Sequence, residues 1–350
     1  MYINLSYLMK SSMKRVDKLA YCLMATVSAI VLAGCSSGGS SGAASGPPPE
    51  QPSIVVEAVP TADEAGLYIA QDNGYFTQQG LSVKIVSIPG GEDGMADLQD
   101  NKAQLVAGNY VSFIQAQIAR SFDNKPINLR IVAEGSVMQA GNQALYVMPN
   151  SRIRTVSDLV KFHAKVGVNT KNNIGQVLLG SLFQSNGLSL SGINQVFDPF
   201  PDLVTMMAKG EISAAWLPEP FATQAKEQLG AVQLADFDQG ALQNFPIGCY
   251  IGSAQWVQEH PNTVAAFLRA LQKGQQVADS DRAAVEQALE KNTAPTPSIL
   301  ADVMTIDTYP LTMDVPRMQR VANAMLEFGV IKKPYNIINM IQPEPGMVNP

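Results

Sequence analysis

The sequence is poor in the residues that build metal and catalytic sites. Two of its 350 residues are histidines, His163 and His260, and three are cysteines. The histidines do not have the spacing of metal ligands, and no nucleophile motif is present. Residues 90–94 are rich in glycine but lack the Gly-Lys-Ser/Thr sequence of a phosphate-binding loop. The sequence therefore gives little support for an enzyme and predicts no metal and no cofactor.

Charged residues are also scarce, at 15% of the chain. The net charge is −6, and since residues 1–34 carry four basic residues and one acidic residue, the remainder carries −9. Proteins that bind nucleic acids need a basic surface to neutralise phosphates. No nucleic-acid partner is therefore expected.

The apolar run from Leu19 to Gly34 is short for the roughly 20 residues that a membrane-spanning helix needs. Basic residues precede it, so it predicts a secretory signal peptide over residues 1–34. The run ends in Leu-Ala-Gly-Cys35, which resembles the bacterial lipobox, and Cys35 is therefore expected to carry lipid and to begin the mature protein. An uncleaved membrane anchor is the alternative.

The predicted processing leaves Cys249 as the remaining free cysteine, because Cys22 lies in the signal peptide and Cys35 is modified. An intrachain disulfide is thereby excluded from the mature chain. Residues 35–53 are rich in serine, glycine and proline and have too few apolar groups to offset the entropy of ordering. They predict a flexible tether that spans roughly 20 to 25 Å.

Strands and helices alternate along the rest of the sequence. Strands are predicted at 54–59, 81–88, 104–107 and 129–133 and, further on, at 144–148, 166–168, 212–217, 232–235 and 246–253. Helices are predicted between most of them, and a capping box at Thr155 and Asp158 is expected to open one. This alternation predicts mostly parallel sheets with helices on both faces. Residues 261–278, 282–291, 297–306 and 316–328 predict a helical C-terminal segment that packs on the first half.

One segment, Ala214 to Phe221, has the sequence A-A-W-L-P-E-P-F. Its strand should stop at the prolines, which cannot donate ladder hydrogen bonds, so Trp216 and Glu219 are expected at the strand end. The helix before it should end at Gly210, a residue suited to the left-handed conformation.

Residues 98–110 look like a weaker copy of residues 207–219, with Leu98 matching Met207 and Asn101 matching Gly210. Each copy would bring a strand end to a cleft between two α/β halves, although two such segments can also recur by chance.

The sequence resembles the type II periplasmic solute-binding proteins, in particular the family of ABC importers for nitrate, sulfonates, taurine and thiamine-pyrimidine precursors. The residues that carry the resemblance are 65–70 with 74–76, 151–159, 209–221 and His260-Pro261. The resemblance implies a two-lobed type II periplasmic-binding-protein fold, with crossing strands near 144–148 and 246–252 and the solute in the cleft. We expect one lobe from residues 54–145 and 247–350, and the other from 146–246.

The sequence departs from the sulfonate- and nitrate-binding members in the second lobe. The family usually has a Lys-Gly-Lys turn after the residues equivalent to Asp158 and Leu159, and residues 160–165 lack it. Residues 169–173 replace the glycine-serine anion loop of the sulfonate binders. The chemistry of the solute is therefore left open.

Solutes in such sheets bind beyond the carboxyl ends of the strands, so the loops there supply the candidate ligands. The predicted solute-binding residues are Thr61, Asp63, Gly91, Asn109, Tyr110, Ser136, Asn169, Thr170, Asn173, Trp216 and Glu219. Trp216 could stack on the solute or be a structural aromatic residue. Lys171 is the only cation of these loops, and a lone loop lysine is usually solvated. The acidic loops favour a neutral or amino-bearing solute, whereas the family resemblance equally admits sulfonates.

The interpretation that agrees with all these features is an extracytoplasmic, lipid-anchored binding protein of an ABC importer. Its expected partners are a small-molecule solute, the permease subunits and the membrane, reached through the N-terminal lipid, and a monomer is expected. The lobes are expected to close on the solute by a hinge in the crossing strands. The alternatives are an enzyme of pyrimidine-precursor or cofactor biosynthesis on the same fold, and an extracellular sensor or adhesion module.

Overall fold

The computed structural model describes residues 46–293 and 303–341. The predicted signal peptide, Cys35, most of the tether and most of the helix expected at 297–306 lie outside the described residues. The described part of the chain belongs to one compact unit, residues 42–350. Among the described residues no helix has the length and apolar character needed to cross a bilayer.

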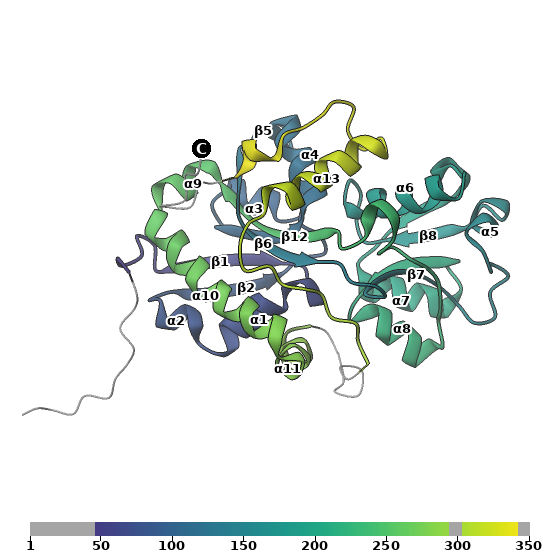
Figure 1. Cartoon of the computed structure of the whole chain (residues 1–350), viewed down its shortest axis with the longest axis horizontal. Helices are drawn as coiled ribbons and strands as arrows, with labels where there is room; N and C mark the ends of the chain where they lie inside the picture. The colour runs from purple at the N-terminus through teal and green to yellow at the C-terminus, as the bar shows by residue number, and fades with distance from the viewer. Residues whose placement is uncertain (1–45, 294–302, 342–350) are drawn as a thin grey trace, which may run out of the picture. The chain divides into compact units, whose positions relative to one another are not determined.

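Strands and helices alternate as the sequence predicts (Figure 1). The strands are β1 (Ser53–Ala58), β2 (Ser82–Ser87), β3 (Leu105–Asn109), β4 (Ser121–Phe122), β5 (Lys125–Pro126), β6 (Leu129–Val137), β7 (Gln143–Val147), β8 (Lys165–Val168), β9 (Asn194–Phe197), β10 (Ala214–Pro218), β11 (Val232–Asp236) and β12 (Pro246–Ser253). The helices are α1 (Ala65–Asp72), α2 (Tyr75–Gln78), α3 (Met95–Gln99), α4 (Tyr110–Ala119), α5 (Val156–Lys161), α6 (Ile174–Ser185), α7 (Phe200–Lys209), α8 (Phe221–Leu229), α9 (Ala254–Glu259), α10 (Pro261–Ser280), α11 (Arg282–Asn292) and α13 (Val315–Glu327).

Two five-stranded sheets carry the fold. The first has the order β2-β1-β3-β12-β6 and the second the order β11-β7-β10-β8-β9. In the first sheet β1 is parallel to β2 and β3, and β12 is antiparallel to both β3 and β6. In the second sheet β8 is parallel to β9 and β10, whereas β7 is antiparallel to β10 and β11. The prediction of mostly parallel sheets with flanking helices is therefore confirmed.

The chain crosses between the sheets twice, at residues 138–142 and 237–245, which we call the crossing segments. The two crossing strands expected near 144–148 and 246–252 lie next to these segments, because β7 of the second sheet and β12 of the first each follow one of them directly. Each strand that follows a crossing is antiparallel to its central neighbour. The expected boundary after residue 145 falls inside β7, and the division into lobes with those bounds stays a prediction.

The suggested repeat occupies equivalent places in the two sheets. β3 and β10 are each the middle strand of a five-stranded sheet, and each is followed directly by a helix or a short loop leading to one. Asn101 and Gly210, which the sequence pairs, both adopt left-handed conformations, with φ of 56° and 70°. The similarity of the two segments thus reflects one local design, a helix and a left-handed turn that lead into a buried central strand.

Several local predictions are confirmed by the described residues. Thr155 and Asp158 form a capping box at the start of α5, and Pro261 occupies the first turn of α10. The helix predicted between the strands at 81–88 and 104–107 is short, because residues 91–94 form turns and α3 begins at Met95. Strand β9 was not predicted, because its four residues are too few to show alternation. α13 packs on α4 and β12, as expected for the C-terminal segment.

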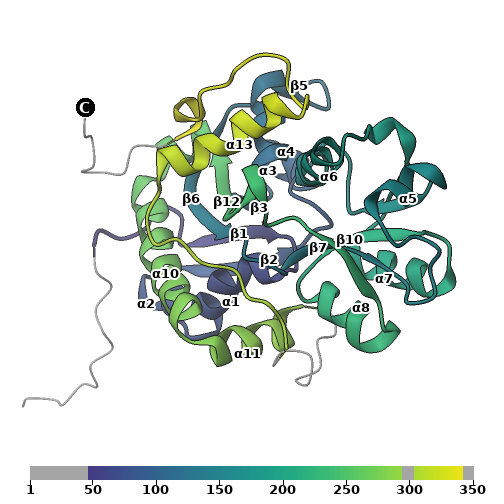
Figure 2. The same ribbon diagram turned by 45° about the vertical axis from the view of Figure 1, so that its right-hand side comes forward.

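Helix α1 lies along α10 on one side of the first sheet (Figures 1 and 2). The helices approach closely because glycines stand at their contact. An added Cβ at Gly274 would lie 2.0 Å from the carbonyl oxygen of Gly66, and one at Gly66 would lie 2.7 Å from Cγ of Gln275. Neither position can hold a larger residue without separating the helices, so these glycines fix one wall of the first sheet's core.

We expect Gly274→Ala to destabilise the protein by about 1 to 3 kcal/mol through overpacking. This sign is informative, because the same change in an exposed helix interior stabilises by roughly 1 kcal/mol. Urea unfolding would measure the change. Gln276→Ala, two residues away on the exposed side of α10, should stay within about 0.5 kcal/mol of wild type. An unchanged or increased stability of Gly274→Ala would contradict the close helix contact.

Candidate functional site

A pocket lies where the strand ends of the two sheets meet. The first sheet and its loops line it with Val59, Thr61, Asp63, Glu64, Gly108, Asn109, Ile247 and Gly248, and the second with Gln143, Asn169, Ile174, Phe200, Trp216 and Pro218. Its free volume is about 30 Å³. A water molecule needs roughly 10 to 15 Å³ on this measure, so the pocket in this conformation holds about two waters. A larger solute can enter only if the walls move apart.

The wall from the first sheet is acidic. Asp63 lies in the short helix η1 (Ala62–Glu64) after β1, and its carboxylate accepts hydrogen bonds from the hydroxyls of Thr61 (2.7 Å) and Ser136 (2.8 Å). Glu64 follows it and is 1% exposed, yet its Oε2 has no hydrogen-bond partner. The two carboxyl groups therefore differ, since Asp63 has both oxygens satisfied and Glu64 has one available.

Burial shifts the protonation of both groups. It raises the pKa of Asp63, although the hydrogen bonds from Thr61 and Ser136 offset part of the rise. Burial and the adjacent Asp63 raise the pKa of Glu64 to about 8, with partial compensation by a hydrogen bond with Tyr250. Without a bound cation the Glu64 carboxyl group is thus largely protonated at neutral pH.

The wall from the second sheet is built of amides and aromatic rings. Trp216 lies in β10, is 3% exposed and donates from Nε1 to Oε1 of Gln143 at 2.9 Å. Phe200, at the start of α7, meets the Trp216 ring edge to face, with 5.3 Å between the ring centroids. Asn169, at the end of β8, donates to the carbonyl oxygen of Pro89 at 3.0 Å. These contacts fix the side chains that face a solute.

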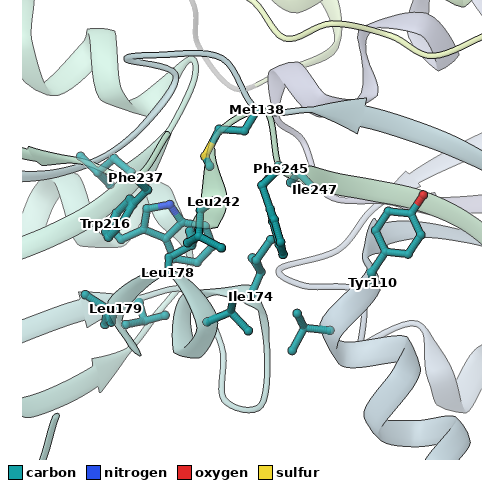
Figure 3. Close-up of a cluster of buried hydrophobic side chains, with 14 of the residues drawn as sticks. Tyr110, Met138, Ile174, Leu178, Leu179, Trp216, Phe237, Leu242, Phe245 and Ile247 are labelled. Atoms are coloured by element: carbon teal, nitrogen blue, oxygen red, sulfur yellow. The ribbon is translucent and has the colours of Figure 1, made fainter. Parts of the chain in front are cut away.

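A buried hydrophobic cluster surrounds this wall and includes the crossing segments (Figure 3). Met138 comes from one crossing segment, and Phe237, Leu242 and Phe245 come from the other. These side chains belong to the same cluster as Trp216, so the crossing segments and this wall of the pocket share one core.

Hydrogen bonds join the two sides of the pocket at both of its edges. At one edge, the backbone N–H of Ala62 donates to the carbonyl oxygen of Glu219 at 2.9 Å. At the other, Ser112 and Gln115 of α4 donate to the carbonyl oxygen of Asn172 at 3.3 and 3.0 Å. The structure therefore shows a closed arrangement, in which each half of the fold contributes groups that only closure brings together.

The structure brings five of the predicted residues together around this pocket. They are Thr61, Asp63, Asn109, Asn169 and Trp216. Asn109 also accepts a hydrogen bond from the backbone N–H of Ser112 and so caps α4. Four of the five lie at or beyond the end of a strand, whereas Trp216, expected at the strand end, lies in the middle of β10.

Ser136, Asn173 and Thr170 were also predicted but do not line the pocket. Ser136 is fully buried behind Asp63, and Asn173 caps α6 and donates to Asn169 and Thr170. Thr170 faces an outer groove next to Glu92. They were predicted because they lie near strand ends, but their side chains point away from the pocket.

Gly91 and Tyr110 also lie outside the pocket. An added Cβ at Gly91 would come within 2.8 Å of the Phe113 ring, so its place is a packing contact with α4. Tyr110 is fully buried in the core because it begins α4 with its ring pointing away from the pocket (Figure 3).

Glu219 is buried beside the pocket and serves the protein's own structure. Its carboxylate accepts hydrogen bonds from the backbone N–H and the hydroxyl of Thr223 at 2.9 and 2.8 Å, and Lys226 lies 3.7 Å away. Burial raises its pKa, and Lys226 and Thr223 oppose the rise. The side chain thus holds the start of α8 in place.

Nine of the residues that line the pocket were not predicted, among them Glu64, Gln143 and Phe200, whose side chains are polar or aromatic. Glu64 belongs to the acidic loops that the sequence shows. Gln143 gave a usable signal, because it is a polar residue at the start of an otherwise apolar strand and must find a partner when buried. Phe200 gave no such signal, because an aromatic residue that follows a proline at the start of a helix is common.

Comparisons with known proteins agree with this geometry. A family model described as NMT1/THI5 like matches residues 61–283, more than half of the chain. No curated protein matches the sequence.

The fold is similar to that of the alkanesulfonate-binding protein SsuA from Xanthomonas axonopodis pv. citri bound to MOPS, with a TM-score of 0.69 and 16% identity, covering 84% of this chain and 99% of that chain. It is also similar to the periplasmic nitrate-binding protein NrtA from Synechocystis PCC 6803, with a TM-score of 0.63 and 17% identity over 73% and 70% of the two chains. The desulfurization enzyme DSZB has a TM-score of 0.62 and 15% identity over 84% and 97%. At these identities the similarities show a shared fold.

The raised pKa of Glu64 predicts that solute-free protein loses stability as the pH rises. Between the ordinary value of 4.5 and about 8, the folded protein holds a proton on Glu64 that the unfolded chain has released. The described titratable groups that interact with it are Asp63, Tyr68, Cys249, Tyr250, Asp307 and Tyr309. Between pH 6 and pH 8 the unfolding free energy of wild type should therefore fall by about 2 kcal/mol through Glu64. Glu64→Gln cannot ionise at this position and should not show this decrease.

Urea unfolding of refolded, solute-free protein at pH 6, 7 and 8 measures this difference. Glu290→Gln, which removes an exposed carboxylate, should follow the wild-type pH dependence. Equal pH slopes for Glu64→Gln and wild type would refute the protonated state of Glu64.

Proposed function

The chain belongs to the NMT1/THI5-like family and has the two-lobed type II periplasmic-binding-protein fold, and on these grounds we propose that it is the extracytoplasmic solute-binding protein of an ABC importer. It captures a small organic solute in the pocket between the two sheets and delivers it to the permease subunits. The proposed solute is a sulfonate-, taurine- or nitrate-type anion or a pyrimidine-like molecule, the classes that the family resemblance implies.

The observation that carries the proposal is the composition of the pocket wall. Buried polar groups of both sheets converge on one small space, with Asp63 and Glu64 on one side and Asn169 and Trp216 on the other. Buried polar groups are costly unless they have partners, so a pocket of this kind is maintained for a ligand.

The proposed mechanism is closure of two lobes on the solute. We place the lobes around the first and second sheets, with the hinge in the crossing segments 138–142 and 237–245. A solute that touches both walls makes contacts that only the closed form can satisfy, and it stabilises that form by differential affinity. The hydrogen bonds from Ala62 to Glu219 and from Gln115 to Asn172 would break on opening.

An enzyme remains the second candidate, because DSZB has a similar fold. The pocket favours binding over catalysis. Its titratable groups are Asp63, held by two hydroxyls, and Glu64, which is protonated at neutral pH without a solute. A gene neighbourhood with a permease and an ATPase would separate an importer component from an extracellular sensor.

The location proposed for the protein is the outer face of the bacterial cell membrane, with lipid on Cys35 and the tether between lipid and fold. The support is the sequence L-A-G-C after a basic and apolar leader. A monomer suits this arrangement, since one fold suffices to enclose the pocket.

Native mass spectrometry of freshly purified protein tests the proposed function. We expect a bound small molecule that dissociates on unfolding and rebinds to the refolded protein. A preparation that carries no molecule, and that binds none from a periplasmic extract, would contradict the proposal.

Trp216→Ala should weaken binding of the co-purified solute about ten- to a hundredfold, equivalent to about 1.4 to 3 kcal/mol, because it removes an aromatic wall of the pocket. Calorimetry measures the affinity, and small-angle scattering measures closure. Trp216→Phe keeps a ring and should lose less. A change below about threefold, together with a radius of gyration unaltered by saturating solute, would show that the site lies elsewhere.

Cys35→Ser should prevent lipidation and either release the protein from membranes or stall its processing. Membrane fractionation and intact mass report both effects. Cys249→Ser is the matched control, because this thiol is buried in the fold, and it should leave fractionation unchanged. Normal membrane association and mass in Cys35→Ser would contradict the proposed anchor.

A further inference from the structure

The charge of the pocket wall bears on the charge of the solute. The residues that line the pocket include two carboxyl groups, of Asp63 and Glu64, and no lysine, arginine or histidine. Two further buried carboxyl groups, of Glu219 and Asp307, belong to the same group of charges, because burial and then Asp63, Glu219 and Glu64 raise the pKa of Asp307. The pocket therefore lies in a region of negative potential when these groups ionise.

Two described lysines, one beside Glu219 and one two residues after Asn169, have other contacts. Lys226 lies 3.7 Å from the Glu219 carboxylate, and its side chain is 32% exposed. Lys171 lies over the ring of Phe197, 5.3 Å from its centroid, and lines the outer groove. A bound anion would find no lysine, arginine or histidine among the pocket-lining residues to compensate its charge, and any ionised carboxylate beside it would repel it.

Glu64 supplies the point of attachment. Its Oε2 is buried, unpartnered and part of a residue that lines the pocket, whereas both oxygens of Asp63 already accept hydrogen bonds. A buried carboxyl oxygen without a partner costs free energy, and a donor on the solute would remove that cost.

From this geometry we propose that the solute carries a cationic nitrogen group of the amine or amidine type that binds Glu64, and that sulfonate and nitrate anions are excluded. The inference rests on the proposed function and narrows its solute class. On binding, the cation replaces the proton of Glu64, and the resulting charge-assisted hydrogen bond is stronger than a neutral one.

The remaining walls suit the rest of such a solute. The rings of Phe200 and Trp216 offer an apolar surface for a planar or aliphatic body and favour a cation at their faces. The side-chain oxygens of Gln143 and Asn109 accept hydrogen bonds from Trp216 and Ser112. Their amide NH₂ groups can therefore donate to an acceptor atom elsewhere on the solute.

Three probes with one ring and different head groups test the inference: benzamidine is a cation, benzamide is neutral and benzenesulfonate is an anion. Calorimetry at pH 7 would use the detergent-solubilised full chain, freed of co-purified solute. We expect benzamidine to bind at least tenfold more tightly than benzenesulfonate. Glu64→Gln should weaken benzamidine at least tenfold and benzamide less than threefold, and Glu290→Gln should change neither.

Native mass spectrometry separates failure of the inference from failure of the proposed function. A co-purified sulfonate or nitrate, or tighter binding of benzenesulfonate than of benzamidine, would overturn the inference and leave the solute-binding function standing. Loss of benzamidine binding in Glu290→Gln, or none in Glu64→Gln, would overturn the role of Glu64. If no solute co-purifies and no probe binds, both proposals fail.

Discussion

The closed arrangement depends on Glu219, a glutamate buried where the two sheets meet. Its carboxylate accepts both hydrogen bonds of Thr223 and so fixes the turn from β10 into α8. Its carbonyl oxygen accepts the N–H of Ala62, which joins the second sheet to η1. Because Asp63 and Glu64 follow Ala62 directly, the same contact positions the acidic wall of the pocket. Glu219 therefore takes part both in the turn that follows β10 and in the contact that holds the two sides of the pocket together.

Burial of a carboxyl group costs free energy, and the fold compensates this cost for some of the buried carboxyl groups more than for others. Hydroxyls satisfy Asp63, and Thr223 with Lys226 satisfies Glu219. Glu64 is left with an open oxygen and a raised pKa, which makes it the group whose state a solute can change most. The pocket would then select between solutes mainly through the hydrogen-bonding groups that have no partner in the protein. The shape of the pocket would matter less.

The fold was predictable because its signals are local. Apolar runs with prolines and glycines at their ends predicted nearly every strand. Gly210 and the matching Asn101 mark the left-handed turns before the two central strands. The site was predictable in part. Strand ends indicated Thr61, Asp63, Asn109, Asn169 and Trp216, but the same rule also selected Tyr110 and Gly91, whose contacts are with the core.

The sequence by itself determined the alternation of strands and helices, the leader with its cysteine, and the acidic character of the loops, because each of these depends on neighbouring residues alone. Only the tertiary structure decided that the chain crosses between the sheets at 138–142 and 237–245 and that Gln143 pairs with Trp216. It also decided that Glu219 serves the protein while Glu64 is open to a solute. The reason is physical: what a buried carboxyl group can bind depends on which distant donors already satisfy it, and closure of the two sheets chooses those donors.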